Sequence, residues 1–77
     1  MRRMTDEELS DEAAWRALLG SRVTLRFRLG GDPAHPFSEA IGVVRSVGEG
    51  RAVVVDRRGK PTEVPLADIL AAKVLSG

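Results

Sequence analysis

The chain contains no cysteine, few aromatic residues and no long hydrophobic run. The absence of cysteine excludes a disulfide framework and any zinc or iron–sulfur site built on thiolates. One Trp, two Phe and no Tyr leave the core to be built mostly from Val, Leu, Ile and Ala. No apolar run approaches the roughly 20 residues of a membrane-spanning helix, and none follows the N-terminus as a secretory signal requires. We therefore expect a cytoplasmic protein that stays out of membranes.

The 77 residues are enough for one domain, and we expect residues 1–77 to form a single folding unit. A hydrophobic content of 43% is typical of a globular chain. The net charge of +1 is unevenly distributed. Residues 1–20 hold three Arg against five Asp and Glu, whereas residues 21–77 hold nine Lys and Arg against six Asp and Glu. The N-terminal segment is therefore acidic, and the remainder is mildly basic.

Residues 22–29, Arg-Val-Thr-Leu-Arg-Phe-Arg-Leu, alternate strictly between polar and apolar side chains. Successive side chains of a strand point to opposite faces, so this segment is predicted to be a half-buried strand. Its inner face is apolar and its outer face is cationic. The rest of the chain must supply apolar side chains that pack on that inner face.

Residues 5–19 are predicted to form one helix that ends at Gly20. Thr5 and Glu8 have the spacing of a capping box. Residues 10–12, Ser-Asp-Glu, offer a second start, which leaves open that the first turns fray or form a separate turn. The apolar stripe at helical spacing consists of Leu9, Trp15, Leu18 and Leu19. A helix this short does not persist alone, so we expect it to dock on an apolar surface through Trp15 and the leucines.

After a loop at residues 30–38, in which Phe37 is expected to tuck back as an anchor, the chain resumes strand character. Further strands are predicted at 39–47, 51–56 and 62–65, with Gly42 marking a bend or bulge. The segment 66–75 fits an amphipathic helix, or one turn at 66–69 followed by a strand at 70–75. We favour the turn and strand, because a fifth strand would cover an exposed edge. The predicted fold is mainly β: a small five-stranded antiparallel barrel at residues 21–75 with one N-terminal α-helix.

Three segments resemble a known domain: residues 20–29, residues 40–44 (Ala-Ile-Gly-Val-Val) and residues 64–73 (Val-Pro-Leu-Ala-Asp-Ile-Leu-Ala-Ala-Lys). Over residues 12–75 the chain is similar to the SH3-like (Tudor-like) N-terminal domain of actinobacterial GNAT-type acetyltransferases. In those enzymes the small barrel precedes a catalytic domain that binds acetyl-CoA through an Arg/Gln-x-x-Gly-x-Gly/Ala loop. We expect neither that catalytic domain nor its loop in this chain, so the resemblance implies an accessory module without transferase activity.

Several residues invite a chemical role but have simpler explanations. His35 lies between two prolines, and we expect an exposed loop residue there instead of a general base. The acidic residues of the N-terminal segment lack the ligand spacing of a calcium loop. Gly48-Glu49-Gly50 is predicted to be a hairpin turn, because no phosphate-binding motif accompanies it. The aromatic residues are expected in the core or as plugs and not as a ligand cage: Trp15, Phe27 and Phe37. We therefore predict no enzyme, catalytic residue, cofactor or metal site.

Basic side chains on the outside of the predicted barrel are the one feature of the sequence that suggests a binding function. The candidate nucleic-acid-binding residues are Arg22, Arg26, Arg28, Arg57, Arg58 and Lys60. Solvated charge explains the same residues, and the acidic helix could lie against part of this face. Two hypotheses remain. The first is a non-catalytic module that binds a protein partner or forms a homo-oligomer, through a barrel edge or the helix face. The alternative is weak binding of nucleic acid.

Overall fold

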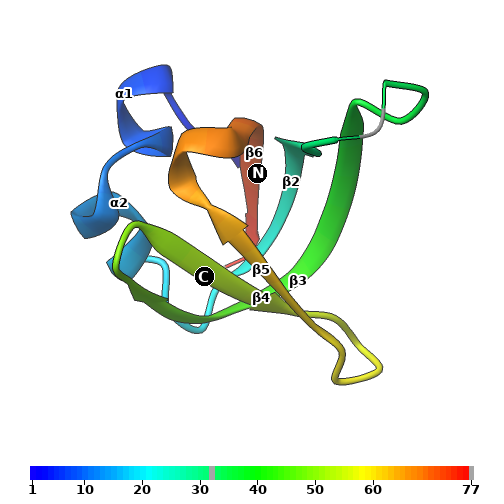
Figure 1. Ribbon diagram of the computed structural model, residues 1–77. Coiled ribbons are helices and arrows are strands. Elements are labelled where there is room, and N and C mark those ends of the chain that lie inside the picture. The colour runs from blue at the N-terminus through cyan, green and yellow to red at the C-terminus, as the bar shows by residue number, and fades with distance from the viewer. Residues whose placement is uncertain (32, 77) are drawn as a thin grey trace.

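The strand predicted at residues 22–29 lies at the centre of an antiparallel sheet, and the chain is mainly β. The computed structural model describes residues 1–31 and 33–76. The elements in chain order are β1 (Arg2–Arg3), α1 (Asp6–Leu9), α2 (Glu12–Arg16), β2 (Arg22–Arg28), β3 (Phe37–Gly48), β4 (Arg51–Val55), β5 (Pro61–Pro65), a 3₁₀ helix η1 (Leu66–Asp68) and β6 (Ile69–Ser76) (Figure 1). The strands form one sheet in the order β1-β6-β2-β3-β4-β5.

The sheet coils on itself through the long strand β3, which pairs with β2 by its first half and with β4 by its second (Figure 1). The register between β3 and β4 slips between Val44 and Ser46, so Arg45 is an extra residue that bends the strand. Gly42 lies where the backbone of β4 crosses closely above β3. An added Cβ there would overlap the carbonyl oxygen of Val55. The bend expected at Gly42 is therefore a close backbone approach, and the bulge comes three residues later.

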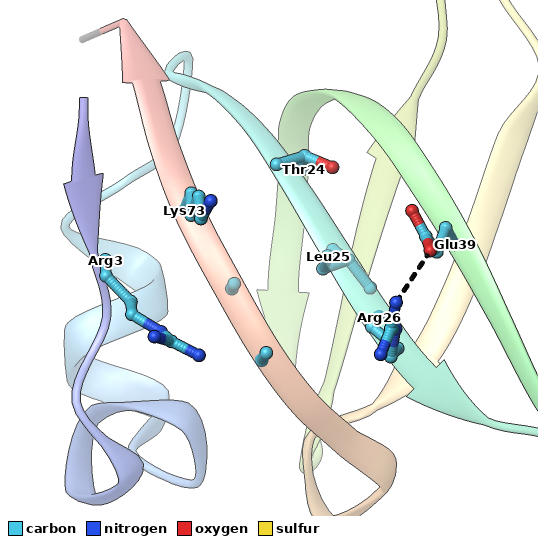
Figure 2. A pocket seen from close by; sticks show the side chains of 8 residues that line it. Arg3, Thr24, Leu25, Arg26, Glu39 and Lys73 are labelled. Carbon is cyan, nitrogen blue, oxygen red and sulfur yellow. Dashed lines mark hydrogen bonds and ion pairs between the residues drawn. The ribbon is translucent and has the colours of Figure 1, made fainter.

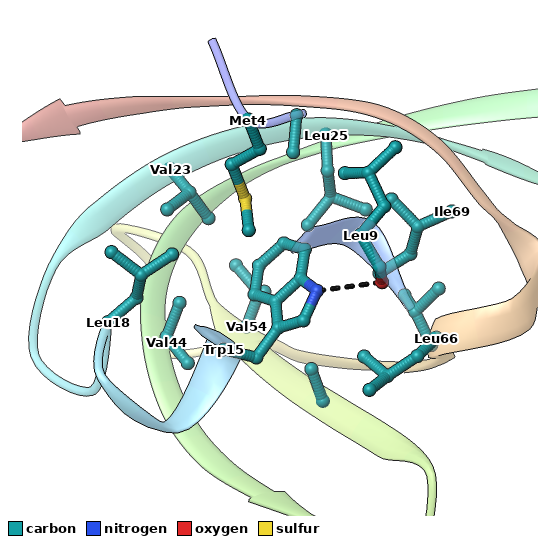
Figure 3. Close-up of a cluster of buried hydrophobic side chains, with 13 residues drawn as sticks. Met4, Leu9, Trp15, Leu18, Val23, Leu25, Val44, Val54, Leu66 and Ile69 are labelled. Carbon is teal, nitrogen blue, oxygen red and sulfur yellow. Dashed lines mark hydrogen bonds between the residues drawn. The ribbon is translucent and has the colours of Figure 1, made fainter. Parts of the chain in front are cut away.

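The inner face of the coiled sheet and the N-terminal helices enclose one hydrophobic core (Figure 3). Trp15 of α2 lies at its centre and is completely buried. The sheet contributes small and branched side chains around the indole: Val23, Leu25, Val44, Val54, Val64, Ile69 and Ala72. The expected docking of the helical segment through Trp15 is confirmed. Leu19, however, is exposed, and its predicted place in the apolar stripe is wrong.

The single helix predicted at residues 5–19 is wrong in detail, because the structure breaks it into α1 and α2. Thr5 and Glu8 form the expected capping box at the start of α1. The Asp11 carboxylate then accepts a hydrogen bond of 3.0 Å from the Ala13 amide and begins α2. Two caps within seven residues start two separate helices, since each cap fixes non-helical backbone at its own residue.

The five-stranded barrel is also wrong in detail. The sheet has a sixth strand, and within the described residues its edge strands β1 and β5 are not paired to each other. The sixth strand is β1, whose two arginines lie antiparallel to β6 beside Val74 and Lys73. The chain then turns inward, and the Met4 amide donates to the Ala72 carbonyl at 2.9 Å. The favoured reading of the C-terminal segment is confirmed, because η1 leads directly into β6.

Within residues 1–31 and 33–76, no helix has the length and apolar character needed to cross a membrane.

Candidate functional site

The outer surface of the sheet over β1, β6, β2 and β3 carries a concentration of cationic side chains. Along β2, Val23 and Leu25 are buried, so the residues between them point outward. The register places Lys73 of β6 beside Thr24, and Arg3 of β1 beside Lys73. We define the basic outer face by its seven cations: Arg3, Arg22, Arg26, Arg28, Arg57, Arg58 and Lys73.

The middle of this face is a shallow depression between β6 and β2 (Figure 2). Arg3, Lys73 and Arg26 stand around it, and Thr24 offers a hydroxyl between them. The guanidinium of Arg26 is paired with Glu39 across the β2–β3 ladder, with Nη2 and Oε1 3.1 Å apart. Both side chains are more than half exposed, so this pair is weak and exchanges readily for another anion.

The tip of the β4–β5 hairpin extends the basic outer face at one end. Arg57 and Arg58 line a second depression together with Arg22, Ile41 and Asp56. The Asp56 carboxylate shapes this tip by accepting hydrogen bonds of 2.9 Å from the amides of residues 58 and 60. Two segments that are more than thirty residues apart in sequence thus bring cations to the same surface.

Not every predicted residue reaches this face. Five of the six predicted nucleic-acid-binding residues do. Lys60 instead lines a neighbouring depression with Phe27, Ser38 and Thr62, which shares Glu39, Ile41 and Asp56 with this face. Arg3 and Lys73 were missing from the prediction, since neither belongs to a segment with a basic pattern of its own. Their position depends on the pairing of β1 and β6 with β2, which no local pattern reveals.

Charge on the molecule is segregated. The basic outer face holds seven of the twelve Lys and Arg residues, against Glu39 and Asp56 among the acidic residues that the structure describes. Among the described residues, the pair of Arg26 with Glu39 is the one ion pair made by a cation of the basic outer face. The acidic helices pack on the inner side of the sheet, where Leu9 and Trp15 enter the core. They therefore do not cover the basic outer face, contrary to the alternative raised from the sequence.

Large apolar side chains are also exposed on the outer side of β3. Phe37 is 55% exposed and Ile41 is 48% exposed. Phe37 lies directly opposite Arg28 in the β2–β3 register and lines a depression with Leu29 and Pro36. The prediction that Phe37 tucks back as an anchor is therefore wrong. Its ring forms part of the same outer surface as the cations.

The other candidate residues are dispersed. His35 is exposed in the loop between β2 and β3, whose residue 32 lies outside the described residues. Among described residues, no cluster of three or more His, Asp or Glu side chains is placed to hold a metal ion. In the acidic segment, Glu8 and Asp11 serve as helix caps, and Glu12 lies 3.7 Å from Arg16.

The expected absence of the Arg/Gln-x-x-Gly-x-Gly/Ala pattern is wrong, because residues 45–50, Arg-Ser-Val-Gly-Glu-Gly, match it. The structure places them at the end of β3 and in the tight turn to β4. Glu49 and Gly50 have positive φ values of 56° and 74°, as a two-residue hairpin turn requires. No helix begins there, so the segment lacks the row of amides that binds a pyrophosphate at a helix N-terminus.

A model of one protein family matches residues 17–73, well over half of the chain, and it describes the Rv0428c N-terminal Sm-like domain. The chain belongs to this family. No protein with a curated description matches it.

Proposed function

We propose that this Sm-like domain is a non-catalytic interaction module and that the basic outer face is its binding surface for an anionic macromolecule. The observation that carries the proposal is the gathering of seven cations from β1, β6, β2 and the β4–β5 tip on one side of the sheet. A surface of this kind raises the local concentration of anions and steers their approach.

The helix face and the sheet edges are poorly suited to binding a protein partner. Trp15 and Leu9, on the apolar face of the helical segment, are buried in the core. Association through a sheet edge is hindered on both sides, because β1 covers β6 and prolines begin and end β5. The proposed module therefore binds through the outer face of the sheet instead of an edge.

The resemblance of residues 12–75 to the N-terminal domains of GNAT-type acetyltransferases supports a role beside a catalytic domain. In this role the module supplies binding and no chemistry. The hairpin conformation of residues 45–50 supports that division, since it offers no site for acetyl-CoA.

The test is a titration of the protein with fluorescent oligo-dT and with a fluorescent poly-glutamate peptide, at about 20 and 200 mM salt. We expect at least one polyanion to bind at low salt and to weaken steeply at the higher salt. The double variant R22Q/K73Q should bind more weakly. The control R16Q/R51Q removes the same charge from ion pairs elsewhere and should bind nearly as wild type. If neither polyanion binds at low salt, the proposed function is wrong.

A further inference from the structure

We infer that the anionic partner of the basic outer face is a single-stranded nucleic acid, one of whose bases stacks on Phe37. This inference rests on the proposed function and adds the class of ligand. The outward side chains of β2 are Arg22, Thr24, Arg26 and Arg28. Alternate residues of a strand are ~6.8 Å apart, so these side chains follow one another at regular intervals along β2. The spacing is similar to that of successive phosphates in an extended single strand.

The row of cations ends beside an aromatic ring. Arg28 and Phe37 are directly opposite in the antiparallel register, and Phe37 is 55% exposed. An exposed phenylalanine at the first residue of a strand gains nothing from the core. Single-strand binders combine a basic track with such rings, because every base has a face that can stack. This juxtaposition supplies the aromatic element that the pattern of the sequence alone did not.

The same geometry disfavours the competing anions. A duplex keeps its bases stacked inside, so it can use the cations but not the ring of Phe37. An acidic peptide likewise offers carboxylates to the arginines but no flat ring to stack. The outward residues of β3 are Phe37, Glu39 and Ile41, and Ile41 gives a second apolar contact for an unpaired base next to Arg22. A ligand with alternating charge and flat apolar rings fits this surface best.

The experiment measures anisotropy of four labelled probes with the whole chain: oligo-U, oligo-dT, a DNA duplex of the same length and a poly-glutamate peptide. Three variants are compared with wild type: Phe37→Ala, Phe37→Leu and Phe37→Trp. Because Phe37 is exposed, we expect all three to fold, which far-UV circular dichroism and thermal melting check. Leu keeps the apolar bulk without a flat ring, and Trp keeps the ring.

We expect both single strands to bind more tightly than the duplex and the peptide. Phe37→Ala and Phe37→Leu should weaken single-strand binding at least about fivefold, Phe37→Trp should preserve it, and the peptide should be unaffected. Equal binding of duplex and single strand, or an Ala variant that binds like wild type, would overturn the inference while leaving the proposed function intact. Preferential binding of poly-glutamate would do the same and identify an acidic protein as the partner. If none of the four probes binds, the proposed function itself fails.

Discussion

The indole Nε1 of Trp15 donates a hydrogen bond of 2.9 Å to the backbone carbonyl oxygen of Leu9. This buried bond joins the two helices across the Ser10–Asp11 break, while the ring itself fills the centre of the core (Figure 3). One side chain thus fixes both the angle between α1 and α2 and their position on the sheet.

Replacing Trp15 by Phe removes that hydrogen bond and part of the buried ring. We expect the free energy of unfolding to fall by about 2 kcal/mol or more, from the lost bond together with the cavity. Urea denaturation followed by circular dichroism measures the change. Leu19→Ala is the control, because Leu19 is exposed and its truncation should change stability by about 0.5 kcal/mol or less. Equal stability of W15F and wild type would contradict the central role of the indole.

The sequence predicts β2 well because alternation is a local property of a strand. β6 depends on a different argument, that a further strand covers an exposed edge, because the pattern of residues 66–75 also fits a helix. β1 could not be found this way, since two arginines have no alternation and become a strand only by pairing with β6. The sequence pattern also did not reveal which face of β3 points inward. Its inner residues are the small ones, Ser38, Ala40 and Gly42, because the coiled sheet leaves little space there. Phe37 and Ile41 are consequently turned outward, and with them the apolar part of the candidate site.

Gly42 should be the glycine least tolerant of substitution. Gly42→Ala places a Cβ against the carbonyl group of Val55, and backbone cannot move aside as a flexible side chain can. We expect a loss of about 2 kcal/mol or more in the free energy of unfolding. Gly48→Ala in the same strand is the matched control, because its Cβ would meet nothing within 4 Å. A similar, small effect of both substitutions in urea denaturation would show that β3 and β4 do not cross closely.

The carboxylate of Glu8 ties α1 to β1 and makes part of the stability depend on pH. A hydrogen bond from the Thr5 amide, followed by one from the Arg2 guanidinium, holds the pKa of Glu8 below its ordinary value of 4.5. A carboxyl whose pKa is lowered by folding stabilises the native state at pH values above 4.5. That contribution is lost as the pH falls through the lower pKa of the folded state.

Glu8→Gln keeps an oxygen for the Thr5 amide but has no proton to gain. We therefore expect wild type to be the more stable protein at pH 6 and the difference between the two to shrink as the pH falls from about 5 to 3. Thermal unfolding of both proteins across this range measures the difference, and subtraction removes the effect of the other carboxyls. A difference that stays constant with pH would mean that Glu8 is not held ionised by folding.

The free edge of β5 is protected by its prolines. The amide of residue 56 donates to the carbonyl of residue 60, and the amide of residue 66 donates to that of residue 50. In an antiparallel ladder these bonds turn the nitrogen atoms of Pro61, Glu63 and Pro65 away from β4. Only Glu63 can then donate a hydrogen bond from the outer edge, so this edge is a poor template for a further strand.

The double variant P61T/P65T restores the two missing donors. We expect it to associate at concentrations where wild type sediments as a monomer, with a rise in apparent mass in analytical ultracentrifugation. Pro36→Thr is the control, because it removes a proline from the β2–β3 loop without opening an edge. If the double variant has no higher apparent mass than wild type, the prolines do not prevent association through the edge of β5.

Glu39 is expected to limit the affinity of the basic outer face, because it engages the guanidinium of Arg26. Glu39→Gln should strengthen binding of oligo-dT by about two- to fivefold, since an exposed ion pair is worth at most about 1 kcal/mol. Glu63→Gln is a matched control: it makes the same charge change in an equally exposed pair with Arg51, on β4 and β5. Titrations at about 20 mM salt compare the two. An equal gain from both variants would show that oligo-dT responds to net charge alone, and the basic outer face would then not be the binding surface.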